Sequence, residues 1–249
     1  VDVSSDFISE EINNYIKEKL NKKMTCVIMI DDYLSVTINV YYESEGDTQI
    51  KQLLYMIIKY LRYISSISTI EISTLEINYY LVDIKKIINE EPILTNNQVN
   101  SGSTLVGSSS FINIWRKEEI LKVTLHELIH AFGFSRYKDS EKLIKYYNEK
   151  YNVNSKIINS DEAYTEVWAN ILNCFLISQL YNEKSYTKFL TMISLEINYS
   201  IYLAQKILDK IKGLNKLDIN KETNVLAYYL IRAEIYENFD KFIKISKNE

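Results

Sequence analysis

The only two histidines of this 249-residue chain, His126 and His130, stand four residues apart, and Glu127 directly follows the first. Residues 117–132 have the apolar periodicity of an α-helix, on which positions i and i+4 lie on the same face. Both imidazoles can therefore bind one metal ion at about 2.0–2.1 Å. Glu127, turned by about 100° from His126, can reach a water at that ion without binding the ion. The segment predicts a metal site with His126 and His130 as ligands and Glu127 as general base.

The third ligand has to be something other than histidine. A catalytic zinc takes three protein ligands and leaves one position open. No other histidine exists in the chain, and the two cysteines are far from the motif in sequence. A carboxylate is therefore expected. The segment 159–170, NSDEAYTEVWAN, offers Glu162 and Glu166, which lie one helical turn apart.

The order of apolar patterns predicts an α+β protein. Helices are expected at about 6–20, with Ser5 or Asp6 as the cap, at 48–63 and at 117–132, where Gly133 suits the end of the helix. Strands are expected at 25–30, 34–42, 75–82 and 111–115, and residues 95–110 form a loop or an irregular edge strand. Beyond Gly133 the pattern is almost wholly helical: 139–151, 161–181, 185–211 and 222–245. We expect one catalytic domain, with a lobe at about 1–135 containing a mixed sheet and the active-site helix, and a helical lobe at about 136–249.

Composition excludes some partners. The net charge of −4 gives no basic face for nucleic acid, and no run approaches the roughly 18 apolar residues of a membrane span. The two cysteines provide no disulfide framework. We expect no nucleic-acid partner, no membrane span and an intracellular location, with secretion as the alternative. Abundant Ile, Asn, Lys and Tyr, which share A/T-rich codons, favour a genome such as that of a large DNA virus or an intracellular parasite.

The motif resembles known zinc peptidases. The run HELIHAFGFSR begins like the longer motif of the metzincins, but Arg136 occupies the place of their third histidine, which excludes that family. The segment DEAYTEVWAN resembles the third-ligand helix of the thermolysin-like gluzincins. That likeness implies that Glu162 binds zinc and that Glu166 supports one of the histidines. In a second register, Glu166 to Ala169 resembles the Glu-x-x-Ala of other gluzincins, so Glu166 stays a rival ligand.

A wider run of residues, NNQVNSGST, FINIWRKEEILKVTLHELIHAFG and DEAYTEVWAN, resembles zincins encoded by large DNA viruses. The resemblance implies a zincin fold, Zn²⁺ as cofactor and, if the chain is viral, the host cytoplasm as location. In gluzincins the substrate lies as an added strand against an edge strand, here Asn100, Ser101 and Gly102. A donor to the transition state would come from the C-terminal lobe, with Tyr229 and Arg232 as candidates.

The expected function is that of a zinc-dependent metallopeptidase, an endopeptidase that hydrolyses peptide bonds within a protein or peptide substrate. Glu127 would act as general base on the water held by the zinc, in a cleft between the two lobes. Two alternatives are open. The chain could be a catalytically degenerate zincin-fold interaction module, or it could be a carboxypeptidase acting on a protein tail. The carboxypeptidase needs a basic clamp such as Arg232 or Arg116.

Overall fold

The computed structural model describes residues 8–88, 90–91, 93–135, 138–180, 185–214 and 216–246. The chain separates into two compact units, Val1–Ile87 with Asn96–Phe134, and Ile88–Thr95 with Ser135–Glu249. Strands occur in the first unit, and the second unit is built of helices. The prediction of an α+β chain with a mixed sheet and a helical C-terminal region is confirmed.

The described residues of the first unit form a five-stranded sheet of order β1-β2-β3-β5-β4. Its strands are β1 (Lys22–Met29), β2 (Ser35–Tyr42), β3 (Thr74–Tyr80), β4 (Gly102–Leu105) and β5 (Ser109–Trp115). The central strands β2, β3 and β5 are parallel, whereas β1 and β4 run antiparallel to their neighbours. Four of the five strands fall where the apolar runs predicted them. The remaining strand, β4, is an edge strand of the sheet within the described part of the chain.

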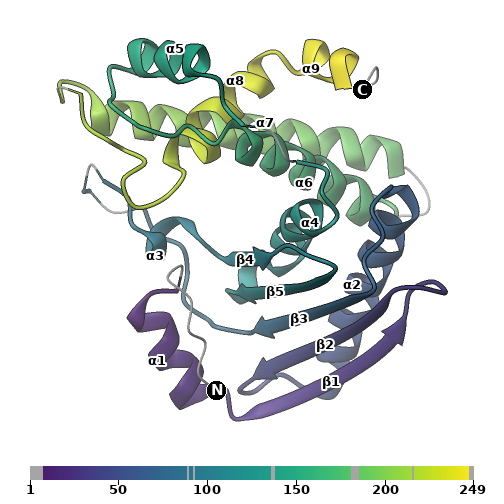
Figure 1. Ribbon diagram of the computed structural model, residues 1–249. Helices are drawn as coiled ribbons and strands as arrows, with labels where there is room; N and C mark the ends of the chain where they lie inside the picture. Colours follow the sequence, from purple (N-terminus) through teal and green to yellow (C-terminus); the bar gives the residue numbers. More distant parts are fainter. Residues whose placement is uncertain are drawn as a thin grey trace. The chain divides into compact units, whose positions relative to one another are not determined.

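Helices lie on both faces of this sheet (Figure 1). One face carries α2 (Asp47–Ile67) and α4 (Ile120–Ala131), and Tyr79 of β3 exchanges a 3.0 Å hydrogen bond with Thr124 of α4. The other face carries α1 (Glu10–Lys19), which packs Ile12 and Ile16 against Tyr80 and Trp115. The alternation of strand side chains between the two faces thus gives each helix layer its own apolar surface.

The start of α1 differs from the sequence-based prediction. Ser9 caps the helix, and its hydroxyl accepts a hydrogen bond from the backbone N–H of Ile12. The predicted caps, Ser5 and Asp6, lie outside the described residues. Serine is favoured at this position because its oxygen satisfies an N–H group that has no partner within the helix.

Gly133 ends the active-site helix as the sequence predicted. Its φ is 69°, in the left-handed region that favours glycine. Its N–H donates to the carbonyl of His130, and the N–H of Phe134 donates to the carbonyl of Ile129. These two bonds form a Schellman motif, which satisfies the last carbonyls of the helix. The helix therefore ends at Ala131, one residue after His130.

The second unit is helical. Its elements are α5 (Glu141–Tyr151), α6 (Ser160–Ser178), α7 (Ser185–Ile211), the π-helix η2 (Leu226–Ile231), α8 (Arg232–Glu237) and α9 (Phe239–Ser246). The single helix predicted over 222–245 is therefore three segments. The π-helix η2 continues directly into α8, and Asn238, which leaves helical geometry, separates α8 from α9. Residues from α6, α7 and α8 share one apolar cluster, which includes Val167, Ile193 and Tyr236.

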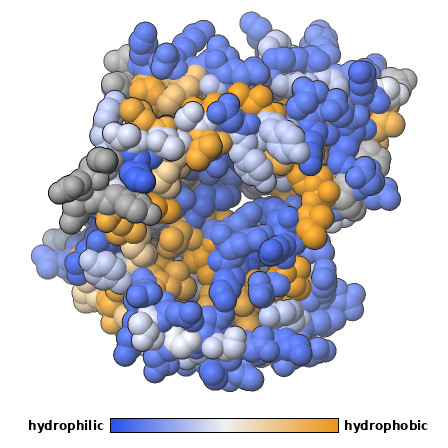
Figure 2. All heavy atoms as spheres, turned by 180° about the vertical axis from the view of Figure 1, so that it is seen from behind, coloured by the Kyte–Doolittle hydropathy of each residue, from blue (hydrophilic) through white to orange (hydrophobic). Residues whose placement is uncertain are grey.

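No helix in the described part of the chain is both long enough and apolar enough to cross a bilayer. Figure 2 shows one face of the molecule, where hydrophobic residues emerge in separate groups among a mainly hydrophilic surface.

Candidate active site

The two histidines lie on α4 with their ring nitrogens close together. The Nε2 atoms of His126 and His130 are 3.2 Å apart, and the ring centroids are separated by 4.9 Å. Two nitrogens that bind one tetrahedral ion at about 2.0–2.1 Å lie about 3.3 Å from each other. The helical spacing of four residues has therefore brought the two imidazoles to the separation that a shared metal ion requires. This part of the site is formed by α4 alone.

Glu127 points from the same helix toward the edge strand β4. Its side chain is buried, with 5% of its surface exposed. Thr104 of β4 donates a hydrogen bond from its hydroxyl to Oε2 of Glu127 at 2.6 Å. Gly102 lies two residues earlier on the same side of β4, and a Cβ there would come within 2.4 Å of Glu127 Oε1. The carboxylate is thus enclosed by an edge strand that approaches closely because position 102 has no side chain.

The edge strand begins later than the sequence suggested. Of the three residues predicted for it, only Gly102 belongs to β4. Asn100 ends the short helix α3 (Asn96–Val99), where its N–H donates to the carbonyl of Asn96. Ser101 is buried and its hydroxyl donates to Glu119 Oε2 at 2.8 Å. Asn100 and Ser101 therefore precede the strand and are anchored by hydrogen bonds, and the strand itself covers Gly102–Leu105.

Glu119 joins the start of α4 to Lys86 and Ser101. It is the last residue of the 3₁₀ turn η1 (Lys117–Glu119), and its Oε2 also lies 2.8 Å from Lys86 Nζ. Burial by itself raises the pKa of this carboxyl group. The positive charges of Lys86 and Lys122, with the hydrogen bonds from Lys86 and Ser101, outweigh burial and lower the pKa from 4.5 to about 2. The ionised form of Glu119 is thus favoured by the folded state.

This shift predicts a pH dependence of stability. The folded pKa lies below the unfolded one, so the stabilisation is complete above about pH 5 and is lost as the pH falls toward about 2. A shift of this size corresponds to roughly 3 kcal/mol of the free energy of unfolding. We expect Glu119→Gln to remove that part of the acid sensitivity, measured by denaturant unfolding at several pH values. The exposed neighbour Glu118→Gln is the control, and parallel acid profiles for wild type and Glu119→Gln would contradict the assignment.

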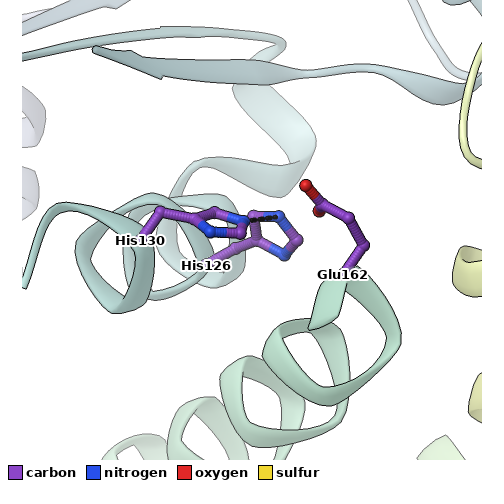
Figure 3. A group of neighbouring side chains, drawn as sticks. All are labelled: His126, His130 and Glu162. Carbon is purple, nitrogen blue, oxygen red and sulfur yellow. Dashed lines mark hydrogen bonds between the residues drawn. The ribbon is translucent and has the colours of Figure 1, made fainter. Parts of the chain in front are cut away.

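Glu162 lies in the first turn of α6, where it accepts a 2.9 Å hydrogen bond from the hydroxyl of Tyr228. Tyr228 belongs to the π-helix η2, an irregular turn of a kind found often at functional sites. Among the described residues, His126, His130 and Glu162 form a group able to hold a metal ion, with ligand atoms within 4.8 Å of one another (Figure 3).

Glu166, the rival ligand, has a different environment. It is buried in α6, and its Oε1 accepts a hydrogen bond from Arg232 Nη1 at 2.9 Å. Burial by itself lowers the pKa of the guanidinium, but the neighbouring acidic groups together outweigh burial and raise the pKa of Arg232. The buried ring of Tyr229 lies beside the same guanidinium, with its centroid 5.9 Å from Arg232 Cζ. Arg232 is therefore paired with Glu166 in the interior of the second unit, and its role as a substrate donor or clamp stays a prediction.

Arg116, the other suggested clamp, is fully buried in the first unit. Its guanidinium donates to the backbone carbonyls of Ile84, Asn97 and Asn100. Its φ is 97°, a backbone conformation that a residue with a side chain adopts at a cost. The arginine joins Ile84, Asn97 and Asn100, which all precede β4, so its guanidinium is occupied within the first unit and does not offer a clamp for a substrate carboxylate.

Sequence reasoning missed Thr104 as a neighbour of Glu127. The signal available was the alternation of side chains along a strand, which puts residues 102 and 104 on one side. That signal required residues 102–105 to be recognised as a strand, and their Gly/Ser-rich composition favoured a loop instead.

No family model matches the chain. A viral relative, "Uncharacterized protein R210" of Acanthamoeba polyphaga mimivirus, is 30% identical over 152 residues, which are 58% of this chain and 36% of that protein. The chain thus spans little more than a third of the relative's length. Among solved structures, an aminopeptidase N family protein from Idiomarina loihiensis is similar over 91% of this chain and 38% of its own, with a TM-score of 0.45 and 11% identity. A similarity of that size establishes neither the fold nor the activity. The chain is therefore related at a distance to a viral protein, and its candidate active site holds a His126, His130 and Glu162 group that could bind a metal ion.

Proposed function

We propose that the chain is a zinc-dependent metallopeptidase with a zincin fold. One observation carries the proposal. On α4, the Nε2 atoms of His126 and His130 are 3.2 Å apart, and Glu127 from the same helix presents a buried carboxylate. A metal site that only stabilises a fold has no use for a carboxylate between its two histidines, whereas hydrolysis requires a base beside the ligands.

The donor set suits zinc. Two imidazole nitrogens and one carboxylate oxygen are a common ligand set of catalytic zinc sites, and they leave a fourth position open. Glu162 is the proposed third ligand, because Glu166 is engaged by Arg232. The hydroxyl of Tyr228 would hold the Glu162 carboxylate in its orientation, as partners of metal ligands usually do. A zinc ion held there would polarise a carbonyl group and lower the pKa of a water to near 7.

Glu127 performs the proton transfers in this proposal. As the water oxygen forms a bond to the carbonyl carbon of the peptide, Glu127 accepts one of the water's protons. As the carbon–nitrogen bond breaks, Glu127 passes that proton to the leaving amine. One water is consumed, and a carboxylic acid and an amine are formed. The low exposure of Glu127 excludes bulk water, which would otherwise weaken these interactions.

The edge strand β4 is the proposed binding surface for the peptide. Trp115 donates from its N–H to the carbonyl of Ser101. In an antiparallel ladder, hydrogen-bonded pairs alternate with pairs whose backbone groups point away from the partner strand. The backbone groups of Gly102 and Thr104 therefore point away from β5 and can pair with an extended peptide. Since Arg116 and Arg232 are both engaged by groups of their own units, we propose cleavage within a chain.

Metal content after substitution tests the ligand set. Wild-type protein reconstituted with Zn²⁺ is expected to hold about one zinc per chain by plasma mass spectrometry. Glu162→Ala removes a direct ligand, so we expect the zinc affinity to fall by at least about 100-fold. Glu166→Gln keeps an acceptor for Arg232 and should retain zinc.

Asp161→Ala, which removes the neighbouring carboxylate, is the matched control and should also retain zinc. Loss of zinc in Glu166→Gln with retention in Glu162→Ala would move the ligand by one helical turn. A wild-type protein that binds no zinc after reconstitution would contradict the proposed function.

A further inference from the structure

We propose that Thr104 is a positioning residue for the general base. Its hydroxyl holds the Glu127 carboxylate in the orientation that proton transfer requires, while Gly102 leaves the space that this orientation needs. The inference rests on the proposed function, and it gives β4 a part in the chemistry besides that of binding a peptide.

The contact is short and has the character of a bond to an ionised group. Thr104 Oγ1 lies 2.6 Å from Glu127 Oε2 and 3.3 Å from the backbone carbonyl oxygen of the same residue. A hydroxyl has one proton to donate, and distances of about 2.5–2.7 Å are typical of O–H···O⁻ bonds. The carboxylate oxygen is therefore the acceptor. Oε2 is held by the hydroxyl, which restricts the orientation of the whole carboxylate.

The position of the second carboxylate oxygen, Glu127 Oε1, explains why residue 102 is a glycine. A Cβ at position 102 would lie 2.4 Å from Glu127 Oε1 and 2.9 Å from Cδ of the same side chain. Contacts this short do not occur between real atoms, so any other residue at 102 would displace the carboxylate or the strand. Gly102 and Thr104 thus restrict one oxygen each, which removes much of the freedom of a long side chain.

The strand that carries Thr104 is itself firmly placed. Thr104 pairs in register with Ile112 of β5, which is completely buried. Ser101, just before the strand, is tied to Glu119 at the start of α4. The hydroxyl and the carboxylate therefore belong to two elements held together at one end by a hydrogen bond. Groups positioned on rigid elements in this way can orient a base to within a fraction of an ångström.

The test compares Thr104→Val, which keeps the shape but lacks the hydroxyl, with Thr104→Ser, which keeps the hydroxyl. The probe is fluorescein-labelled unfolded casein, followed by a quenched peptide made from the first cleavage site mapped in it. We expect Thr104→Val to lower kcat by about 10- to 100-fold with KM within about twofold. Thr104→Ser should stay within about threefold of wild type, with zinc content and thermal midpoint unchanged in both. Equal kcat for wild type and Thr104→Val would overturn the proposal.

Two further variants separate positioning from a general loss of packing. Thr37→Val makes the same chemical change on the opposite face of the sheet and should leave kcat unchanged. Glu127→Asp withdraws the carboxylate by one methylene from Thr104. If Thr104 acts through Glu127, adding Thr104→Val to Glu127→Asp should lower kcat by less than about threefold. A full additional loss in that background would mean that Thr104 acts in another way.

A crystal structure of the zinc-loaded protein separates this inference from the proposed function. If wild type cleaves neither probe, the peptidase proposal fails, and the structure still reports on Thr104. A hydroxyl bonded to Glu127 in wild type, with the carboxylate turned away in Thr104→Val, would support the positioning role. An unmoved carboxylate in Thr104→Val would overturn it.

Discussion

Glu127→Gln is expected to lower peptide cleavage by about 10²- to 10⁴-fold while the protein keeps its zinc. Glutamine has the shape of glutamate and an amide oxygen that can accept the hydrogen bond from Thr104. It cannot accept a proton from water at neutral pH, so the contribution of the general base is lost. Zinc content should not change, because the proposed ligands are His126, His130 and Glu162, and Glu127 is not among them. The measurement is kcat/KM on the quenched peptide, with zinc determined on the same samples.

Glu118→Gln is the matched control for this experiment, since it makes the same change at an exposed carboxylate near the start of the same helix. It should leave both cleavage and zinc content unaltered. Retained cleavage in Glu127→Gln would mean that a different group accepts the proton, and the role assigned to the motif would be wrong. Joint loss of zinc and activity would instead make Glu127 part of the metal site.

Arg232→Ala is expected to lower the free energy of unfolding by about 3–5 kcal/mol. The substitution leaves Glu166 as a buried carboxylate without its ion-pair partner, and an uncompensated buried charge is costly. The reference is the double variant Glu166→Leu with Arg232→Met. That variant replaces both charges by apolar side chains and should regain most of the lost stability. The measurement is denaturant unfolding followed by circular dichroism, to which the helices of the second unit contribute strongly.

Lys145→Ala provides the contrast, because Lys145 and Glu149 form an exposed ion pair at 3.8 Å. Exposed pairs add little to stability, so the unfolding midpoint should hardly move. A similarly small effect of Arg232→Ala would show that Glu166 can find water or another donor. In that case Glu166 would return as a candidate metal ligand.

Much of the first unit could be predicted from the sequence. The helix around His126 and Glu127 was evident from apolar periodicity, and its end at Gly133 from the preference of glycine for left-handed backbone. These features depend on neighbours within a few residues. The parallel strands β3 and β5 were also recognised, because both are short runs rich in β-branched and aromatic residues, with apolar positions that alternate along β3.

What the sequence left open depended on distant partners. Glu162 and Glu166 are equivalent in local pattern, and distant partners distinguish them: Tyr228 donates to Glu162, and Arg232 donates to Glu166. The Gly/Ser-rich run of residues 101–104 has the composition of a loop, yet pairing with β5 makes Gly102–Leu105 a strand. Tertiary contacts overrode local propensity at both places.

Gly102 couples two positions that are far apart in sequence. A carboxylate as long as glutamate at position 127 and a side chain at position 102 cannot occupy the same space. A larger residue at position 102 would therefore require the Glu127 carboxylate to turn, a shorter side chain at position 127, or a shift of the strand. In any collection of homologous sequences, a bulky residue aligned with Gly102 would indicate a protein in which the residue at 127 is shorter or differently oriented, or in which the edge strand has shifted.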